Sequence, residues 1–476
     1  MRNSLILIIA TVTLANSAKA QQKWTLPQCV DYAMTNNITV RQTDLQTRLS
    51  ELNYSQSKMG QYPTLSFNGG PGYNSGRNQD PTSFSLITQS YVSANMQLQS
   101  SAQIFNWYSK KNLIAANQWE VEASKAGTDK LKNDIALTVA NVYLQILLAK
   151  EQQKIANVQL QQSQAQLSNT RKLVDAGALP ELNASELEAQ MARDSSNLIS
   201  AKGSVDQTVL SLKAYMSMDA ATPFEIDEPP VEKIPVEKIS DLLPETVYAL
   251  ALANQPLQRF DEFKLRAAQK NTAAAKSGMY PTVSIYGSLA SGYNSRAQDV
   301  TGSTPIIAPI GTVAVGGTNY NVFALQPYNS YTYSKSGFFH QLDQNFRQSV
   351  GLSLNVPIFN GSSLRSAYDR SKINIQNLQL QKELDNQKLK NDIYQAYNAA
   401  LVALEKFNAG KKTLESAGRT YSFAQKRYDV GMLTTIDLIT NENNLFSAKL
   451  QNALNHFDYV FKMKVLEFYK GQGLKL

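Results

Sequence analysis

The sequence is short of the residues from which metal sites and nucleophilic active sites are usually built. Among its 476 residues there are two histidines, His340 and His456, and one cysteine, Cys29, so an intrachain disulfide is excluded. With one cysteine, these two histidines cannot assemble a convincing zinc site or a Cys/His nucleophile. We therefore expect no catalytic residue, no metal and no cofactor, and the protein is not expected to be an enzyme.

Long apolar runs and clustered charge are also missing. After the first twenty residues, no run approaches the roughly 18 apolar residues that a membrane helix needs. The formal net charge is +8, but the basic residues are scattered and do not gather with aromatic side chains. This distribution gives poor support for binding to nucleic acid.

The N-terminus has the organisation of a secretory signal peptide. Arg2 precedes an apolar stretch, and the small residues Ala18 and Ala20 flank Lys19 as at a cleavage site. An ordinary N-terminal helix is the alternative. We expect residues 1–20 to be removed and the mature chain to be exported. A polar residue precedes Cys29, which favours a small buried side chain over a lipidated one.

The rest of the chain is a tandem duplication. Five short segments recur in the same order, and their first copies begin at Leu26, Tyr62, Gly72, Ile104 and Asp175, while their second copies begin at Leu243, Tyr280, Gly292, Ile358 and Asp429. We expect a first repeat at residues 21–218, a proline-marked connector at 219–241 and a second repeat at 242–476. The second repeat is longer, because it carries an insertion that we expect to be a surface loop at about 295–347.

Each repeat is expected to contain two short helices, two strands, a long helix, a tight turn and a return helix. The long helices, at residues 106–174 and 360–428, contain no proline and little glycine. Ile393, Tyr397 and Ala400 begin a 4,3 spacing that is typical of a coiled-coil seam. Such helices would be about 100 Å long at 1.5 Å per residue.

The strand candidates alternate strictly between apolar and small polar residues. In one of them Val350, Leu352 and Leu354 alternate with Gly351 and Ser353. Half-buried strands of a soluble sandwich show the same pattern, but these strands run about ten residues, which suits a tilted crossing of a bilayer. Four strands cannot close a barrel, whereas three copies of the chain would supply 3 × 4 = 12. We therefore predict an α+β membrane protein with a trimeric 12-stranded barrel.

Three motifs carry a resemblance to a known family. They are the opening at residues 24–26 (WTL), the corner at 356–361 (VPIFNG) and the turn at 428–433 (YDVGML). In their order and spacing, over essentially the whole mature chain, they resemble the TolC-like outer-membrane efflux family. The resemblance implies a trimeric transmembrane β-barrel that continues as a long periplasmic α-helical barrel.

The resemblance also implies a function and partners. The chain would be a passive outer-membrane channel, in contact with membrane lipid, and the exit duct of a tripartite efflux pump or a type I secretion system. A periplasmic adaptor protein would connect this homotrimer to an inner-membrane transporter of RND or ABC type. A secreted structural or adhesive coiled-coil protein is the main alternative, but it leaves the four strands unexplained. An exported hydrolase that uses a carboxylate pair is a second alternative.

Residue by residue, the resemblance points to two turns and one gate. The helix–turn–helix tips that meet the adaptor match the residues Asp175, Gly177, Leu179, Asp429, Gly431 and Leu433. Asp437 matches an acidic position that narrows the closed periplasmic entrance, while Thr440 stands where the family can carry a second acid. Asp437 is equally explained as an acid that complements the positive end of its own helix.

Overall fold

The structure is a computed structural model that describes residues 23–80 and 84–471. The signal peptide expected at residues 1–20 lies outside the described residues. Two compact units are present. The helical unit takes the chain up to Tyr54, Ala116–Gln269 and the chain from Ile373 onward, and the sheet unit takes Ser55–Ala115 and Lys270–Lys372.

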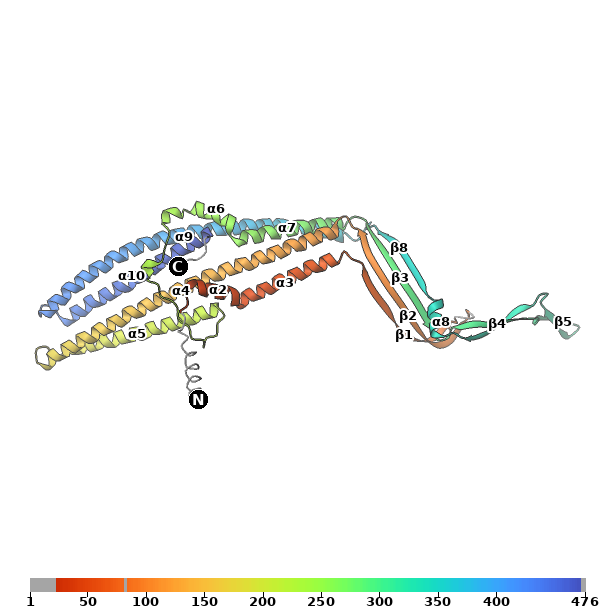
Figure 1. The fold of residues 1–476 in the computed structure, drawn as a ribbon, viewed down its shortest axis with the longest axis horizontal. Helices are drawn as coiled ribbons and strands as arrows, with labels where there is room; N and C mark the ends of the chain where they lie inside the picture. Colours follow the sequence, from red (N-terminus) through yellow and green to blue (C-terminus); the bar gives the residue numbers. More distant parts are fainter. Residues whose placement is uncertain (1–22, 81–83, 472–476) are drawn as a thin grey trace, which may run out of the picture. The chain divides into compact units, whose positions relative to one another are not determined.

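The elements follow one another in the same order in both halves of the chain (Figure 1). The first half contains α2 (Leu26–Asn36), α3 (Ile38–Met59), β1 (Thr64–Gln79), β2 (Leu86–Phe105), α4 (Ser109–Asp175) and α5 (Glu181–Tyr215). The second contains α6 (Pro244–Asn254), α7 (Pro256–Ser277), β3 (Thr282–Asn294), β8 (Arg347–Asn355), α9 (Ser363–Asp429) and α10 (Thr435–Lys470). Two 3-10 turns, Val231–Lys233 and Ile239–Asp241, lie between the halves. The tandem repeat predicted from the sequence is confirmed.

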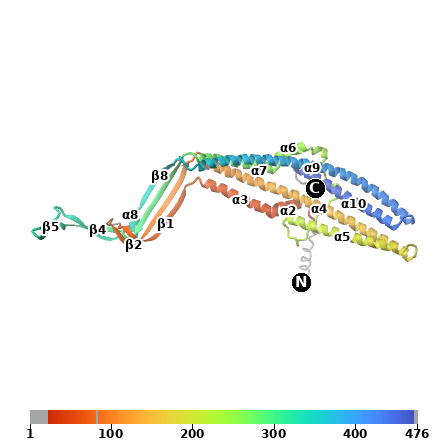
Figure 2. The ribbon, with the colours of Figure 1, turned by 180° about the vertical axis from the view of Figure 1, so that it is seen from behind.

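The repeat is regular to the residue in its helical part. Helix α9 begins at 363 and α4 at 109, and 363 − 109 is 254. Helix α10 begins at 435 and α5 at 181, and 435 − 181 is again 254. Both long helices have 67 residues and lie where the sequence predicts them. Each forms a hairpin with its return helix, as both views show (Figures 1 and 2).

Short helices continue the return helices end to end. The Asn37 side chain, just before α3, donates from Nδ2 to the Tyr215 carbonyl at the end of α5, at 2.7 Å. The Ile38 N–H is 3.2 Å from the Ser217 hydroxyl. Polar groups left over at a helix end are thus satisfied by the next segment. No helix in the described part of the chain is both long and apolar enough to cross a bilayer.

Two apolar clusters hold the helical unit together. In the first, the α4 residues Val139, Tyr143 and Ile146 are buried at the spacing expected of a helix seam. In the second, Ile393 of α9 packs with Met463 of α10. The predicted seam on α9 is confirmed at Ile393 and Ala400, both fully buried, and its other members are half-buried.

A latch joins the start of the described chain to the connector. The Tyr143 hydroxyl lies 3.1 Å from the Trp24 carbonyl and 2.7 Å from the Asp227 carbonyl. Trp24 also pairs with Ile226 in a parallel β-bridge. These contacts fix both segments to the centre of α4.

The sheet unit contains a four-stranded antiparallel sheet in the order β1-β2-β3-β8. Among the described residues, the outer strands β1 and β8 each pair with one neighbour, so each has a free edge. On β8 the apolar side chains of Val350, Leu352 and Leu354 are 66–79% exposed. The alternation predicted from the sequence is therefore present, but none of the described residues covers the apolar face of β8.

The insertion between β3 and β8 is more structured than a loop. Strand β4 (Gln298–Ile306) pairs with β7 (Tyr328–Lys335), and β5 (Pro309–Val315) pairs with β6 (Thr318–Phe323). The short helix α8 (Phe338–Gln344) follows and is fastened to the end of β3. The expectation of four strands is thus correct for the sheet and wrong for the described chain, which has eight strands. The insertion is rich in small polar residues, so the alternation of its strands is not evident in the sequence.

Candidate functional site

The turns at the ends of the two hairpins share one backbone geometry. Gly177 and Gly431 have φ values of +71° and +73°, a left-handed conformation that side chains with a Cβ rarely adopt. In the first turn, Gly177 N–H donates to the Val174 carbonyl and Ala178 N–H to the Leu173 carbonyl, both at 2.8 Å. This pair of bonds is a Schellman motif, which satisfies the last carbonyls of a helix.

The second turn repeats these bonds with different residues. Gly431 N–H donates to the Tyr428 carbonyl at 2.9 Å, and Met432 N–H donates to the Arg427 carbonyl at 2.8 Å. A Cβ added at either glycine would meet no atom within 4 Å. The glycines are therefore required by the backbone conformation and not by crowding, as the sequence predicts.

The side chains of the two turns present a mixed surface. Asp175 and Asp429 are exposed, whereas Leu179 and Leu433 are half-buried. Asp429 accepts a hydrogen bond from the Gln425 amide at 2.9 Å. Val430 and Met432, which are not among the residues predicted to meet the adaptor, are each 68% exposed. Their position, as apolar residues inside a tight surface turn, is the sequence feature that could have indicated their exposure.

Asp437 lies in the first turn of α10 and completes its N-terminal cap. Its N–H donates to the Thr434 hydroxyl at 3.2 Å, and that hydroxyl donates to the Asp437 carboxylate at 2.6 Å. A carboxylate at this position also complements the helix dipole. The side chain is exposed, so capping and a role in the entrance are compatible.

A polar layer joins the two hairpins just above the turns. The Gln166 amide donates to the Tyr421 hydroxyl at 3.2 Å, and Thr170 and Tyr428 share a hydrogen bond of 3.3 Å. On the return helices, the Gln190 amide is 3.1 Å from the Asn443 side-chain oxygen. Each of these bonds connects the first repeat to the second.

Part of this layer is fully buried, which the sequence did not indicate. Gln159, Ser163, Gln190 and Asp194 are at most 4% exposed. Asp194 accepts hydrogen bonds from Ser163 and, at 3.0 Å, from Gln190. By composition alone, the glutamine-rich stretch at residues 152–166 is equally compatible with a solvated face and a channel lining. For Gln159 that interpretation is wrong within the protomer, because the neighbouring helices cover it.

Glu442 is the unusual member of the layer. It is 2% exposed, and neither carboxyl oxygen has a hydrogen-bond partner among the described residues. Burial raises the pKa of Glu442 to about 7, and nearby Asp194 adds to the shift, while the side-chain amides of Gln166 and Gln159 oppose it. The layer therefore contains one acid that is largely neutral below pH 7.

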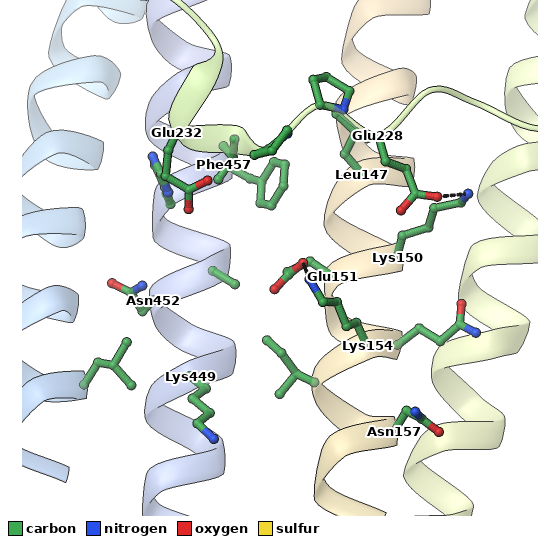
Figure 3. A pocket seen from close by; sticks show the side chains of 18 of the residues that line it. Leu147, Lys150, Glu151, Lys154, Asn157, Glu228, Glu232, Lys449, Asn452 and Phe457 are labelled. Carbon is green, nitrogen blue, oxygen red and sulfur yellow. Dashed lines mark hydrogen bonds and ion pairs between the residues drawn. The ribbon is translucent and has the colours of Figure 1, made fainter. Parts of the chain in front are cut away.

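A groove lies between α4, α5, α10 and the connector, farther from the turns than the polar layer (Figure 3). Its volume is about 810 Å³. Lys150 forms an ion pair with Glu228, and Lys154 lies near Glu151, so both signs of charge line the groove. His456 stacks on Phe407 at 4.3 Å, and burial lowers its pKa. Within the described residues, no group of three His, Cys, Asp or Glu could hold a metal ion.

Comparison with known proteins identifies the family of this pair of hairpins and sheet. The family model described as outer membrane efflux protein matches residues 30–217 and 247–460, one segment in each repeat. The chain belongs to this family. It is an outer-membrane efflux channel with a large periplasmic portion, and the comparisons give no support to a secreted adhesive protein. Members of the family are channel proteins and not enzymes.

Individual relatives are distant but nearly full-length. The toluene efflux pump outer membrane protein TtgC of Pseudomonas putida is 22% identical over 91% of this chain and 82% of its own. The outer membrane protein TolC of Escherichia coli is 21% identical over 96% of this chain and 84% of its own. A crystal structure of CusC superposes with a TM-score of 0.74 at 16% identity, covering 96% of each chain. This likeness confirms the predicted fold.

Proposed function

We propose that three copies of this outer-membrane channel form a passive duct without catalytic activity. At its periplasmic end the duct is joined by an adaptor protein to an inner-membrane transporter of RND or ABC type. It serves a tripartite efflux pump or a type I secretion system. In this arrangement the first repeat (residues 21–218) and the second repeat (242–476) each supply one hairpin, and residues 219–241 connect them.

The free edges of the sheet are the observation that carries the trimer. Strands β1 and β8 each leave one row of backbone N–H and C=O groups without a partner in the described protomer. In a bilayer such an edge is not tolerated, since no water is available to satisfy it. Pairing β8 of one copy with β1 of the next satisfies both edges, and three copies give a closed sheet of 3 × 4 = 12 strands.

Apolar stripes on the helices support the same assembly. On α3, Leu45, Leu49 and Leu52 are 52–64% exposed and follow the 4,3 spacing of one helix face. On α9, Leu380 and Leu384 are 65% and 57% exposed. The two stripes lie on different helices, as a head-to-tail ring contact requires. We propose that each stripe is covered by a neighbouring copy.

The paired turns are the proposed adaptor contact. They comprise Asp175, Gly177 and Leu179 in the first repeat and Asp429, Gly431 and Leu433 in the second. The exposed Val430 and Met432 add apolar area to a surface that is otherwise polar, which is a common composition for a docking site. Asp437, six residues beyond Gly431, would repeat three times around the axis and form a ring that attracts cations.

The mass of the purified protein in detergent tests the proposal. We expect a trimer by light scattering, with mostly helical circular dichroism and a smaller β component. A photo-crosslinking residue at Val430 should capture the adaptor in cells, whereas one at the exposed Ser447 in the middle of α10 should not. A stable monomer without detergent would contradict the barrel, and equal capture at both positions would contradict docking through the turns.

A further inference from the structure

The insertion in the second repeat forms a ribbon with an unusual composition. From Val300 to Ser334 it contains no Asp, Glu, Lys, Arg or His, although 18% of the whole chain is charged. The side chains of Ile307, Ile310, Tyr320 and Leu325 are all more than half exposed. No residue between 300 and 335 is buried. The ribbon thus lacks both a core of its own and the charges that normally keep exposed strands apart.

One face of the outer hairpin, β5–β6, is apolar. Val313 lies opposite Tyr320, and Gly311 lies opposite Val322, so these side chains share a face with Val315. The other face carries the pairs Thr312–Asn321 and Ala314–Asn319. Gly316 and Gly317 close the hairpin with φ values of +62° and +80°, as in a two-residue type I′ turn. The hairpin is therefore well defined and two-sided.

The apolar face has no partner within the described protomer. Val313, Val315, Tyr320 and Val322 are 41–60% exposed. An isolated two-stranded hairpin is marginally stable in water, and a third strand or a packed face is needed for independent stability. A long exposed apolar strand edge is also a site of aggregation unless something covers it.

The connectivity places the ribbon beside the seam between copies. Strand β3 starts after α7, and the insertion leaves from its far end, at Asn294. The chain then returns into β8, which has the free edge that another copy is proposed to pair with. In the trimer, three identical ribbons would therefore leave the barrel at the end away from the helices, each next to a seam.

We propose that the apolar faces of the three ribbons, centred on Val313, Val315, Tyr320 and Val322, pack against one another in the trimer. This inference rests on the proposed trimer. Tethering to one barrel gives the ribbons a high effective concentration, about millimolar for short flexible connections, so no strong individual contact is required. Because residues 300–334 carry no charge, these parts of the ribbons do not repel one another.

A second copy fits this face better than a lipid headgroup or a polar partner protein does. Anionic lipid headgroups are bound through lysine and arginine, and the ribbon has none between Val300 and Ser334. A polar partner protein would be recognised through charged or hydrogen-bonding side chains, which here lie on the opposite face, at Thr312, Asn319 and Asn321. Self-association buries the apolar face and leaves that polar face in water.

Single cysteines on the two faces of β5 test the proposal. We compare Val313→Cys with Thr312→Cys, its neighbour on the polar face of the same strand. The native Cys29 is fully buried, and burial raises its pKa to about 12, so it does not react under mild conditions. Detergent-purified trimers are oxidised gently and run on a denaturing gel without reductant.

The expected result is specific to the face. The proposed packing brings the Val313 positions of neighbouring copies within the roughly 7 Å between Cα atoms that a disulfide requires, so Val313→Cys should form disulfides. Each thiol forms one bond, so the product is a linked dimer and one chain of each trimer stays free. Thr312→Cys should stay unlinked. Intact trimers in which the two variants link equally, or not at all, would overturn the inference alone. Loss of the trimer in unmodified protein would instead refute the proposed function, and this inference with it.

Discussion

Helices α4 and α9 are equivalent in the repeat, yet they lie in different surroundings. Ala126 and Leu380 occupy the same position, since 380 − 126 is 254, but Ala126 is 6% exposed and Leu380 is 65% exposed. Near the middle of each helix the positions agree, because Val139 and its counterpart Ile393 are both fully buried. The duplication therefore preserves the core of each hairpin.

Outside that core the two helices have diverged, and the divergence indicates where other molecules bind. Helix α4 is covered within the protomer, by α7 among others, as the stacking of Trp119 on Phe263 shows. Helix α9 exposes Leu380 and Leu384, where α4 has Ala126 and Lys130, and no described residue of the protomer covers these two leucines. An exposed apolar stripe that is present in only one copy of a repeat is best explained by contact with a neighbouring chain.

Breaking the exposed stripe of α9 should have the largest effect. We expect Leu380→Glu/Leu384→Glu to abolish trimers, because six carboxylates would be forced into the proposed apolar contact. The protomer core is untouched, so helix content should persist. Native mass measurement in detergent checks this outcome, with Asn374→Glu/Gln381→Glu as a control of equal added charge on the polar side. Normal trimers in the leucine variant would remove α9 from the interface.

The turns make the two repeats alike, and changing them should abolish export without disrupting assembly. In Gly177→Val/Gly431→Val, each left-handed position would be strained by about 1–2 kcal/mol, which is small for a trimer but displaces the docking surface. Asparagine tolerates this conformation, so Gly177→Asn/Gly431→Asn should retain export. Trimer yield and efflux of a transported dye are measured together. Unimpaired efflux by the valine variant would exclude the turns from the mechanism.

Glu188 and Glu442 are repeat equivalents with opposite environments, since 442 − 188 is 254. Glu188 is exposed and lies 3.4 Å from Arg171, whereas Glu442 is buried with its pKa raised to about 7. In the unfolded chain the Glu442 carboxyl ionises near pH 4.5. Its contribution to the free energy of unfolding therefore falls as pH rises from about 4.5 to about 7 and is constant above that.

Replacing each of these two acids should change the stability of the protein with a different dependence on pH. Glu442→Gln removes the penalty of ionising a buried group and should stabilise the protomer at pH 8 by up to about 3 kcal/mol, with little change near pH 4. Glu188→Gln should change stability little at either pH. Thermal unfolding followed by circular dichroism at both pH values provides the comparison. A Glu442→Gln gain that is equal at both pH values would mean that folding does not raise the pKa of Glu442.

The smallest effect is expected at the proposed gate. Asp437 has Asn183 as its repeat equivalent, since 437 − 254 is 183, so Asp437→Asn gives both helices the same residue at this position. Removing three charges from a ring should weaken cation selectivity in planar bilayers, while the Thr434 hydroxyl still caps the helix. Asp429→Asn, at an exposed turn position, serves as the control. Unchanged selectivity in Asp437→Asn would assign this residue to capping alone.

The sequence predicts features that depend on local chemistry. Turn glycines, long proline-free helices and strand alternation follow from backbone rules, and the structure confirms the left-handed Gly177 and Gly431. The sequence could not separate Glu442 from Glu188, because both are acids on polar helix segments at the same repeat position. Burial depends on which helices pack nearby, and no local pattern encodes that.

The same limit applies to the insertion and to the polar layer. Its residues 300–334 predict a loop by composition, but they pair as strands because alternate positions carry Val, Tyr and Ile among the small polar residues. Gln159 belongs to a glutamine-rich stretch whose other members are exposed or half-buried, and the helices packed around Gln159 decide that it is buried. Both features require tertiary contacts between distant segments.

The latch at Tyr143 has a consequence for the order in which the chain folds. Its partners, the carbonyls of Trp24 and Asp227, both precede the second repeat, so the latch can close once the chain has emerged as far as Asp227. Both apolar clusters are completed only by α10, the first through Phe457 and Val460 and the second through Met463. During N-terminal-first export, the latch can thus close before α10 arrives, and it holds α4, the start of the described chain and the connector together until α10 packs against them.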